Sequence, residues 1–204
     1  MEKNLKTHWE TVYETKSPQE VSWTQETPQI SLDFIQSFGF NKDVRIIDIG
    51  GGDGLLVDHL LDLGFTNVSV LDISTQAIER AKKRLGERAA MVQWIVSDIN
   101  DFQPEGTYDL FHDRAAFHFL TNPKEINRYI DLVVNHAKNL VIGTFSTDGP
   151  LKCSGLEITQ YNESSLNDLF QPRGFTRINT KREDHQTPFG TSQNFVFASF
   201  DKSE

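Results

Sequence analysis

The stretch that decides the fold reads Val44-Arg45-Ile46-Ile47-Asp48-Ile49-Gly50-Gly51-Gly52-Asp53-Gly54. Its first half is dense in β-branched residues, which favours a buried strand. Its second half places four glycines within five positions. Glycine adopts positive φ easily and lets a ligand approach the backbone closely. A tight strand-to-helix turn needs fewer glycines, so we interpret the segment as a ligand-binding turn at the carboxyl end of a strand.

Short apolar runs alternate with amphipathic segments along the rest of the chain. Further strands are expected at 68–72, 92–96, 108–112, 140–145, 176–183 and 193–200, and helices at 28–38, 54–63, 74–85, 123–137 and 163–170. Pro188 and Gly190 separate the last two strands, which read as an antiparallel pair. The pattern predicts an α/β fold: a Rossmann-like, seven-stranded, mostly parallel sheet with helices on both faces and a C-terminal antiparallel hairpin.

Composition narrows the possible functions. The chain has 204 residues, of which 37% are hydrophobic and 24% charged, as in a globular protein of one domain. A net charge of −9 argues against binding of duplex nucleic acid. Cys153 is the single cysteine, and no histidine pair has metal-ligand spacing, so we expect no disulfide and no metal site. We expect a cytoplasmic protein without membrane contact, because no secretory signal and no apolar run of about 18 residues is present.

The glycine turn does not fit the common phosphate-binding motifs. The dinucleotide fingerprint G-x-G-x-x-G fails because its third position is Leu55, and no Gly-Lys-Ser/Thr follows as in a P-loop. The spacing D-x-G-x-G-x-G resembles instead the first motif of the class I S-adenosylmethionine-dependent methyltransferases. The resemblance implies S-adenosylmethionine as the cofactor and S-adenosylhomocysteine as its product. It also implies a loop lying against the methionine part and the sugar, formed by Asp48, Gly50, Gly51, Gly52 and Gly54.

Two further acids follow strand ends. Asp72 ends the second strand, where a carboxylate can accept hydrogen bonds from both ribose hydroxyls; alternatively it caps the helix after Ser74. Asp98 follows the third strand, where the family's acid accepts from the adenine amine and its neighbour packs on the ring; alternatively it is a turn aspartate. Ile73 and Ile99, next to these acids, complete the expected cofactor contacts.

The fourth strand ends in His112-Asp113-Arg114-Ala115-Ala116-Phe117-His118-Phe119-Leu120. A buried strand end gains nothing from a His-Asp-Arg run, so His112, Asp113 and Arg114 are the candidate catalytic residues. His112 could take a proton or shape the donor pocket. Arg114 could clamp a carboxylate or phosphate, or pair with Asp113 as a structural bridge. His118 is expected to pack among its aromatic neighbours.

This segment resembles that of small bacterial methyltransferases with an H-D-R-A-x-F-H-F-L pattern and, more loosely, the Asp-Arg turn of thiopurine and tellurite methyltransferases. The run from Trp9 to Tyr13, with Trp23, is similar to the lid-like N-terminal segment of those enzymes and of some protein-lysine methyltransferases. Trp9 and Trp23 are therefore expected to cover the cofactor, or else to pack an N-terminal arm. The Cys153 thiol lies either near the donor in a functional role or in packing.

We expect one methyltransferase domain over residues 1–204. Residues 1–40 would form an arm and helix covering the cofactor, 41–145 the cofactor-binding core, and 146–204 an acceptor-side loop and the closing hairpin. The expected activity is methyl transfer to a small-molecule acceptor by in-line displacement, in a monomer or weak dimer. A protein-lysine methyltransferase is the alternative, although the Asp/Asn-Pro-Pro-Tyr/Phe motif is replaced by residues 112–115. A non-catalytic S-adenosylmethionine-binding regulatory module is the second alternative.

Overall fold

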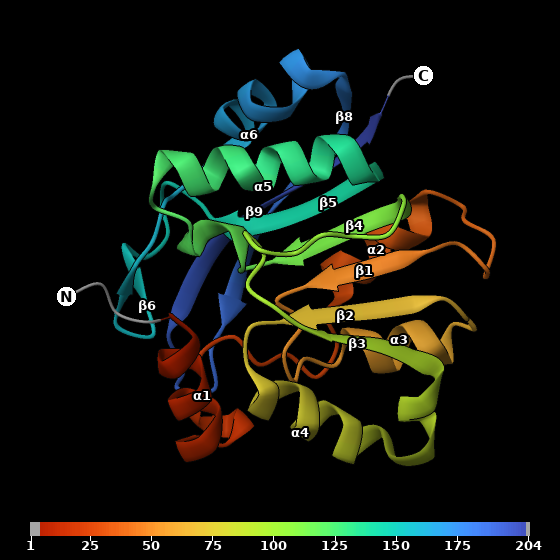
Figure 1. Cartoon of the computed structure of the whole chain (residues 1–204). Helices are drawn as coiled ribbons and strands as arrows, with labels where there is room; N and C mark the ends of the chain where they lie inside the picture. Colours follow the sequence, from red (N-terminus) through yellow and green to blue (C-terminus); the bar gives the residue numbers. More distant parts are fainter. Residues whose placement is uncertain (1–4, 203–204) are drawn as a thin grey trace.

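A single seven-stranded sheet forms the centre of the molecule (Figure 1). The computed structural model describes residues 5–202. The strand order is β3-β2-β1-β4-β5-β9-β8, parallel from β3 to β5, with β9 antiparallel to both β5 and β8. The strands are β1 (Ile46–Ile49), β2 (Val68–Asp72), β3 (Val92–Val96), β4 (Tyr108–Arg114), β5 (Ala137–Phe145), β8 (Phe175–Gln186) and β9 (Ser192–Lys202). The predicted fold class is confirmed.

Helices cover both faces of this sheet. They are α1 (Leu5–Thr15), α2 (Gln29–Ser37), α3 (Leu56–Asp62), α4 (Thr75–Leu85), α5 (Pro123–His136) and α6 (Glu163–Phe170). Within residues 5–202, short 3₁₀ helices span Pro18–Glu20, Gly86–Met91, Phe117–Phe119 and Gln171–Arg173. Two short strands, β6 (Lys152–Cys153) and β7 (Leu156–Glu157), pair with each other outside the main sheet. Among residues 5–202, no helix has both the length and the apolar character required to cross a membrane.

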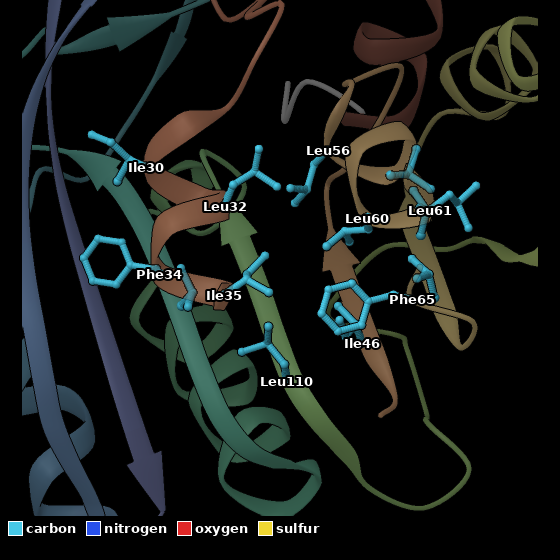
Figure 2. Packing of buried hydrophobic residues seen from close by; sticks show 14 of the residues in the cluster. Ile30, Leu32, Phe34, Ile35, Ile46, Leu56, Leu60, Leu61, Phe65 and Leu110 are labelled. Carbon is cyan, nitrogen blue, oxygen red and sulfur yellow. The ribbon is translucent and has the colours of Figure 1, made fainter. Parts of the chain in front are cut away.

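Two hydrophobic cores follow from the alternation of side chains along the strands. Ile46 of β1 packs with α2, α3 and α4 on one face, whereas its neighbour Ile47 packs with α5 and α6 on the other. Figure 2 shows the first core, where side chains of α2 and α3 gather around Ile46 and Leu110. Because both faces are covered, the carboxyl ends of the parallel strands are where the fold leaves room for a ligand.

Element boundaries agree with the predictions in most places and differ where tertiary contacts decide. Helix α6 has the predicted range, and Ser74 caps α4 by accepting a hydrogen bond from the backbone N–H of Ala77. Helix α3 begins two residues later than predicted, since Gly54 is held in the turn by a 2.9 Å bond to the carbonyl of Gly51. Helix α1 was not predicted, because Val12 and Tyr13 are its only buried residues among those described and its apolar periodicity is weak.

Candidate functional site

A cavity of about 680 Å³ lies at the carboxyl ends of the parallel strands. This volume falls in the range of about 300–1,000 Å³ typical of small-molecule sites. Its wall joins the glycine turn after β1, the acids after β2 and β3, the end of β4, the N-terminal arm and the turn between β8 and β9. Segments far apart in the sequence therefore meet around one space.

The glycine turn has little room for side chains. Gly50 has a φ of +65°, and a Cβ there would lie 2.6 Å from the Cβ of Ala116. A Cβ on Gly51 would lie 2.6 Å from Oδ2 of Asp48. Gly50, Gly51, Gly54 and Asp48 line the cavity. Gly52, with a φ of +51°, does not; it lies beneath Tyr13, whose hydroxyl oxygen would be 2.5 Å from an added Cβ. Gly52 therefore makes room for Tyr13, and its predicted contact with the cofactor stays a prediction.

The two acids after β2 and β3 both face the cavity. Oδ1 of Asp72 accepts a 2.8 Å bond from the N–H of Ser74, and burial raises the pKa of Asp72 to about 7. Oδ1 of Asp98 accepts a 2.9 Å bond from the N–H of Asn100. Each acid thus also makes the local turn contact that was its alternative role. Ile73 and Ile99 line the same part of the wall. The geometry brings the predicted cofactor residues together, and their individual roles stay predictions.

His112 is a buried link between β4, β1 and α2. Its Nδ1 lies 2.7 Å from Oδ1 of Asp48 and its Nε2 lies 2.8 Å from the hydroxyl of Ser31. Only 2% of the residue is exposed, although it borders the cavity. His112 therefore connects Asp48 to Ser31 at the edge of the cavity, and both roles considered for it, proton uptake and shaping of the donor pocket, stay predictions.

Asp113 points to the opposite face of β4 and is not part of the cavity wall. It accepts hydrogen bonds from the Tyr129 hydroxyl at 2.8 Å and from the N–H groups of Ala116 and Phe117 at 2.9 and 3.1 Å. These bonds oppose the effect of burial, which raises its pKa to about 6. The predicted catalytic role is therefore corrected: Asp113 holds the turn after β4.

Arg114 lines the cavity and is not paired with Asp113. Its Nη1 donates to the carbonyl of Trp23 at 3.1 Å, and the guanidinium lies 5.0 Å from the centre of the Phe195 ring. Its Nε and Nη2 are shielded from solvent and have no hydrogen-bond partner among residues 5–202. Burial lowers the pKa of Arg114 to about 10, so the side chain is charged at neutral pH. The structural bridge considered for this residue is not formed.

The backbone around Arg114 is strained where the glycine turn is not. Ala115 has a φ of +71°, and its N–H donates to the carbonyl of Gly143 at 2.8 Å. Ser154 has a φ of +49°. Positive φ is unfavourable for residues with a Cβ and often marks functional sites. Ala115 and Cys153, the neighbour of Ser154, both line the cavity. Burial raises the pKa of Cys153 to about 11, so its sulfur is a thiol at neutral pH.

The N-terminal arm covers one side of the cavity. The ring centres of Trp9 lie 5.6 Å from those of Trp23 and 5.1 Å from those of Phe119, and all three residues line the wall. Figure 1 shows α1 beside the start of α4. The Glu10 carboxylate ties the two helices together, because it accepts bonds of 2.8–3.0 Å from the Ser74 hydroxyl and the first two N–H groups of α4. Trp9 and Trp23 therefore pack the N-terminal arm and also border the cavity, and their contact with the cofactor stays a prediction.

His118 is packed as predicted. It is fully buried between the rings of Phe119 and Phe145, each centred 4.6 Å away, and its Nδ1 accepts from the N–H of Phe145. Burial lowers its pKa to about 3, so the ring is neutral.

Sequence reasoning missed several wall residues. Tyr13 follows Trp9 by four positions, a helical spacing that could have placed both on one face of α1. Ser31 and the turn residues Gln186, Thr187 and Pro188 carried no local signal, since only the tertiary fold brings them to the cavity. Their positions depend on α2 and on the β8–β9 pairing.

Comparison with known proteins identifies the core of the chain. Residues 46–139 match the family model described as a methyltransferase domain. The chain contains a methyltransferase domain. The matched segment begins at β1 and ends in β5, so it includes the glycine turn and the residues after β4. The predicted class I S-adenosylmethionine-dependent methyltransferase family, an enzyme family with this cofactor, is confirmed.

Relatives and solved structures agree on this class. The malonyl-[acyl-carrier protein] O-methyltransferase 2 of Ilyobacter polytropus is 30% identical over 105 residues, covering 51% of this chain and 40% of the relative. The ribosomal protein L11 methyltransferase of Shewanella sediminis is 31% identical over 140 residues, covering 69% and 43%. The 1,6-didemethyltoxoflavin-N1-methyltransferase of Burkholderia thailandensis, solved with its acceptor and S-adenosylhomocysteine, superposes with a TM-score of 0.72 at 16% identity, covering 98% and 88%.

The matches cover about two fifths of the length of these curated methyltransferases. Their printed names specify unlike acceptors, namely an acyl-carrier-bound malonyl group and a ribosomal protein. The family therefore does not identify the acceptor of this methyltransferase domain.

Proposed function

We propose that this protein transfers the methyl group of S-adenosylmethionine to a small-molecule acceptor by in-line displacement. One observation carries the proposal: a single cavity extends from Asp72 and Asp98 to Arg114 and Cys153. In-line transfer requires donor and acceptor side by side in one space, with the nucleophile, the methyl carbon and the sulfur aligned. A module that only bound the cofactor would have no use for the second half of this cavity.

The residues of the first half fit the cofactor. The Asp72 carboxylate can accept from ribose hydroxyls, and Asp98 with the apolar Ile99 can hold an adenine ring. The glycine turn gives backbone access to the methionine part. When bound, the cofactor supplies a methyl group activated by a sulfonium. No phosphate site is required, which agrees with the failed dinucleotide and P-loop motifs.

The second half of the cavity is suited to aligning the acceptor. Arg114 and Cys153 line it, and the Cys153 thiol is protonated at neutral pH. The contribution of the protein would then be to orient the acceptor and to exclude water beneath the arm.

The position of the N-terminal arm over the cavity supports the proposal that the acceptor is a small molecule. Trp9 and Trp23 border the cavity, so an acceptor must fit within a space that also holds the cofactor. The toxoflavin precursor in the Burkholderia thailandensis structure is a small molecule of this kind. A protein-lysine acceptor would have to insert a side chain past the same arm.

The test begins with calorimetry of S-adenosylhomocysteine binding. Turnover of S-adenosylmethionine is then measured with a bacterial metabolite extract divided by ultrafiltration into small molecules and proteins. We expect S-adenosylhomocysteine above the blank with the small-molecule fraction alone. Turnover only with the protein fraction would replace the proposal by protein methylation. Binding without turnover in either fraction would favour a regulatory module, and absence of binding would reject the cofactor site.

A further inference from the structure

We propose that Arg114 binds a carboxylate group of the acceptor, side-on, through its Nε and Nη2. This inference rests on the proposed function, because it assigns the acceptor end of the same cavity. It gives the acceptor a chemical class, a small monoanion with a carboxylate, and it makes Arg114 a specificity-determining residue.

The free edge of the guanidinium is the first argument. Nη1 of Arg114 donates a hydrogen bond to the carbonyl of Trp23, and the face of the guanidinium lies over the Phe195 ring. Nε and Nη2 remain, and they lack a hydrogen-bond partner among the residues from Leu5 to Lys202. These two nitrogens share one edge of the guanidinium plane and direct parallel N–H bonds outward. That edge matches the two oxygens of a carboxylate.

The burial of Nε and Nη2 is the second argument for a ligand at Arg114. Both nitrogens are shielded from solvent, and donors in such a position are normally paired. Two buried donors without partners are costly, and a charge-assisted hydrogen bond to a ligand that reaches them from the cavity would remove that cost. The carbonyl of Trp23 and the ring of Phe195 hold the side chain in place, so little conformational freedom is lost on binding.

The other cation in the wall shows what a purely structural arginine looks like here. Arg84 donates to the Asp58 carboxylate through Nε and Nη2, and to the carbonyls of Asp53 and Gly54 through Nη1 and Nη2. All its nitrogens are engaged in bracing the glycine turn. Arg114 has the same chemistry and a place in the same cavity, but one edge is left for a ligand.

The surrounding charges favour a carboxylate over a phosphate. Glu183 lies near Arg114 and favours its charged form, as does Asp48; Glu183 itself accepts from Nε2 of Gln25 at 3.2 Å. Asp48, Asp72 and Asp98 add acidic groups to the cavity wall. A dianion would be repelled more strongly by these acids than a monoanion. Burial lowers the pKa of Arg114 to about 10, which leaves the guanidinium charged at neutral pH.

The experiment measures binding of simple probes to the full chain saturated with S-adenosylhomocysteine. Hexanoate, hexanamide and inorganic phosphate are titrated by ligand-observed NMR against the parent, Arg114→Gln, Arg114→Lys and Arg173→Gln. Arg173 is exposed at the end of α6, so its variant controls for the loss of one positive charge. Thermal unfolding and S-adenosylhomocysteine affinity of each variant report whether it is folded.

We expect the parent to prefer hexanoate to hexanamide and to phosphate. Arg114→Gln should lose roughly 10- to 100-fold in hexanoate affinity, while its weak hexanamide binding is unchanged. Arg114→Lys, which keeps the charge without the planar edge, should fall between them. Arg173→Gln should behave as the parent.

Three results would overturn the inference: equal binding of hexanoate and hexanamide by the parent, tighter binding of phosphate, or a preference for hexanoate that survives in a folded Arg114→Gln. If S-adenosylhomocysteine binds and methyl transfer occurs but the carboxylate preference is absent, only the assignment of Arg114 fails. If S-adenosylhomocysteine does not bind the parent, the proposed function itself fails.

Discussion

The two ends of the cavity are built by different means. At the end near β1 and β2, positive φ falls on Gly50 and Gly52, where no Cβ opposes it. At the end near β4, positive φ falls on Ala115 and Ser154, which carry a Cβ. The first end is relaxed and formed by consecutive strand tips. The second is strained and held by segments distant in the sequence, such as Trp23 and Phe195 around Arg114.

Under the proposed function, the first end would bind the cofactor that the whole family shares, and the second end would bind the acceptor of this particular protein. A loop that accepts the same cofactor throughout a family can be written as a local motif of glycines and acids. The other end is formed where the arm, β4 and β9 meet, and under the proposed function it would receive the acceptor. Four experiments test or sharpen this comparison.

The largest effect is expected for Gly52→Val at the first end. Its Cβ would lie 2.5 Å from the Tyr13 hydroxyl, on backbone with a φ of +51°. Displacement of Tyr13 and distortion of the turn should abolish detectable S-adenosylhomocysteine binding in calorimetry, a loss of more than roughly a thousandfold, or about 4 kcal/mol. Gly39→Val is the control, since Gly39 has a φ of +64° and open space around it. Unchanged affinity in Gly52→Val would refute the assignment of the turn.

The next effect concerns His112, which connects the two ends. His112→Ala leaves the buried Asp48 carboxylate and the Ser31 hydroxyl without this partner. We expect a loss of about 2–3 kcal/mol in the free energy of unfolding in urea, together with weaker cofactor binding. His136→Ala is the control, because half-buried His136, at the end of α5, makes a 2.8 Å hydrogen bond between its Nδ1 and the carbonyl of Gly106 and does not border the cavity. Equal losses in both variants would deny His112 its linking role.

The pH dependence of the free energy of unfolding tests one buried acid that faces the cavity, Asp72, and one that does not, Asp113. Burial raises the pKa of Asp72 from 3.8 to about 7 and that of Asp113 from 3.8 to about 6. Above pH 4 the unfolded chain releases these protons while the folded protein retains them. The free energy of unfolding should therefore fall, by several kcal/mol, as the pH rises from 4 to 7.

Substitution should divide this fall between the two acids. Asp72→Asn should flatten the part between pH 6 and 7 and reduce the slope between pH 4 and 6, whereas Asp113→Asn should reduce only the slope between pH 4 and 6, in urea titrations at several pH values. A profile that keeps its slope above pH 6 in Asp72→Asn would assign that slope to another group.

The smallest effect is expected at the strained end. Ala115→Gly removes a Cβ from backbone with a φ of +71° and should raise the free energy of unfolding by about 1 kcal/mol. Ala116→Gly, at an ordinary φ of −94°, should lower it instead. Denaturation in urea measures both. If Ala115→Gly is the less stable variant, the contrast between relaxed and strained ends is wrong.

Local patterns gave most of the fold and the first end of the site. The run from Val44 to Gly54 contains a strand, a turn and its ligand chemistry within eleven residues, so one window of sequence was enough. The end of the cavity near β4 could not be predicted from one window of sequence. The sequence placed His112, Asp113 and Arg114 together, but alternation along β4 sends Asp113 to the opposite face. The partners of the other two, Ser31 and Trp23, lie in α2 and the arm, which only tertiary packing brings near.

The Glu10 carboxylate has a consequence for how the domain can be trimmed. It accepts hydrogen bonds from the Ser74 hydroxyl and from the first N–H groups of α4, directly after the turn that carries Asp72. The N-terminal arm is thereby connected to the start of α4. Deletion of α1 would therefore remove more than the cover of the cavity. It would also remove the hydrogen bonds that hold Ser74 and the start of α4, next to Asp72, the expected ribose contact.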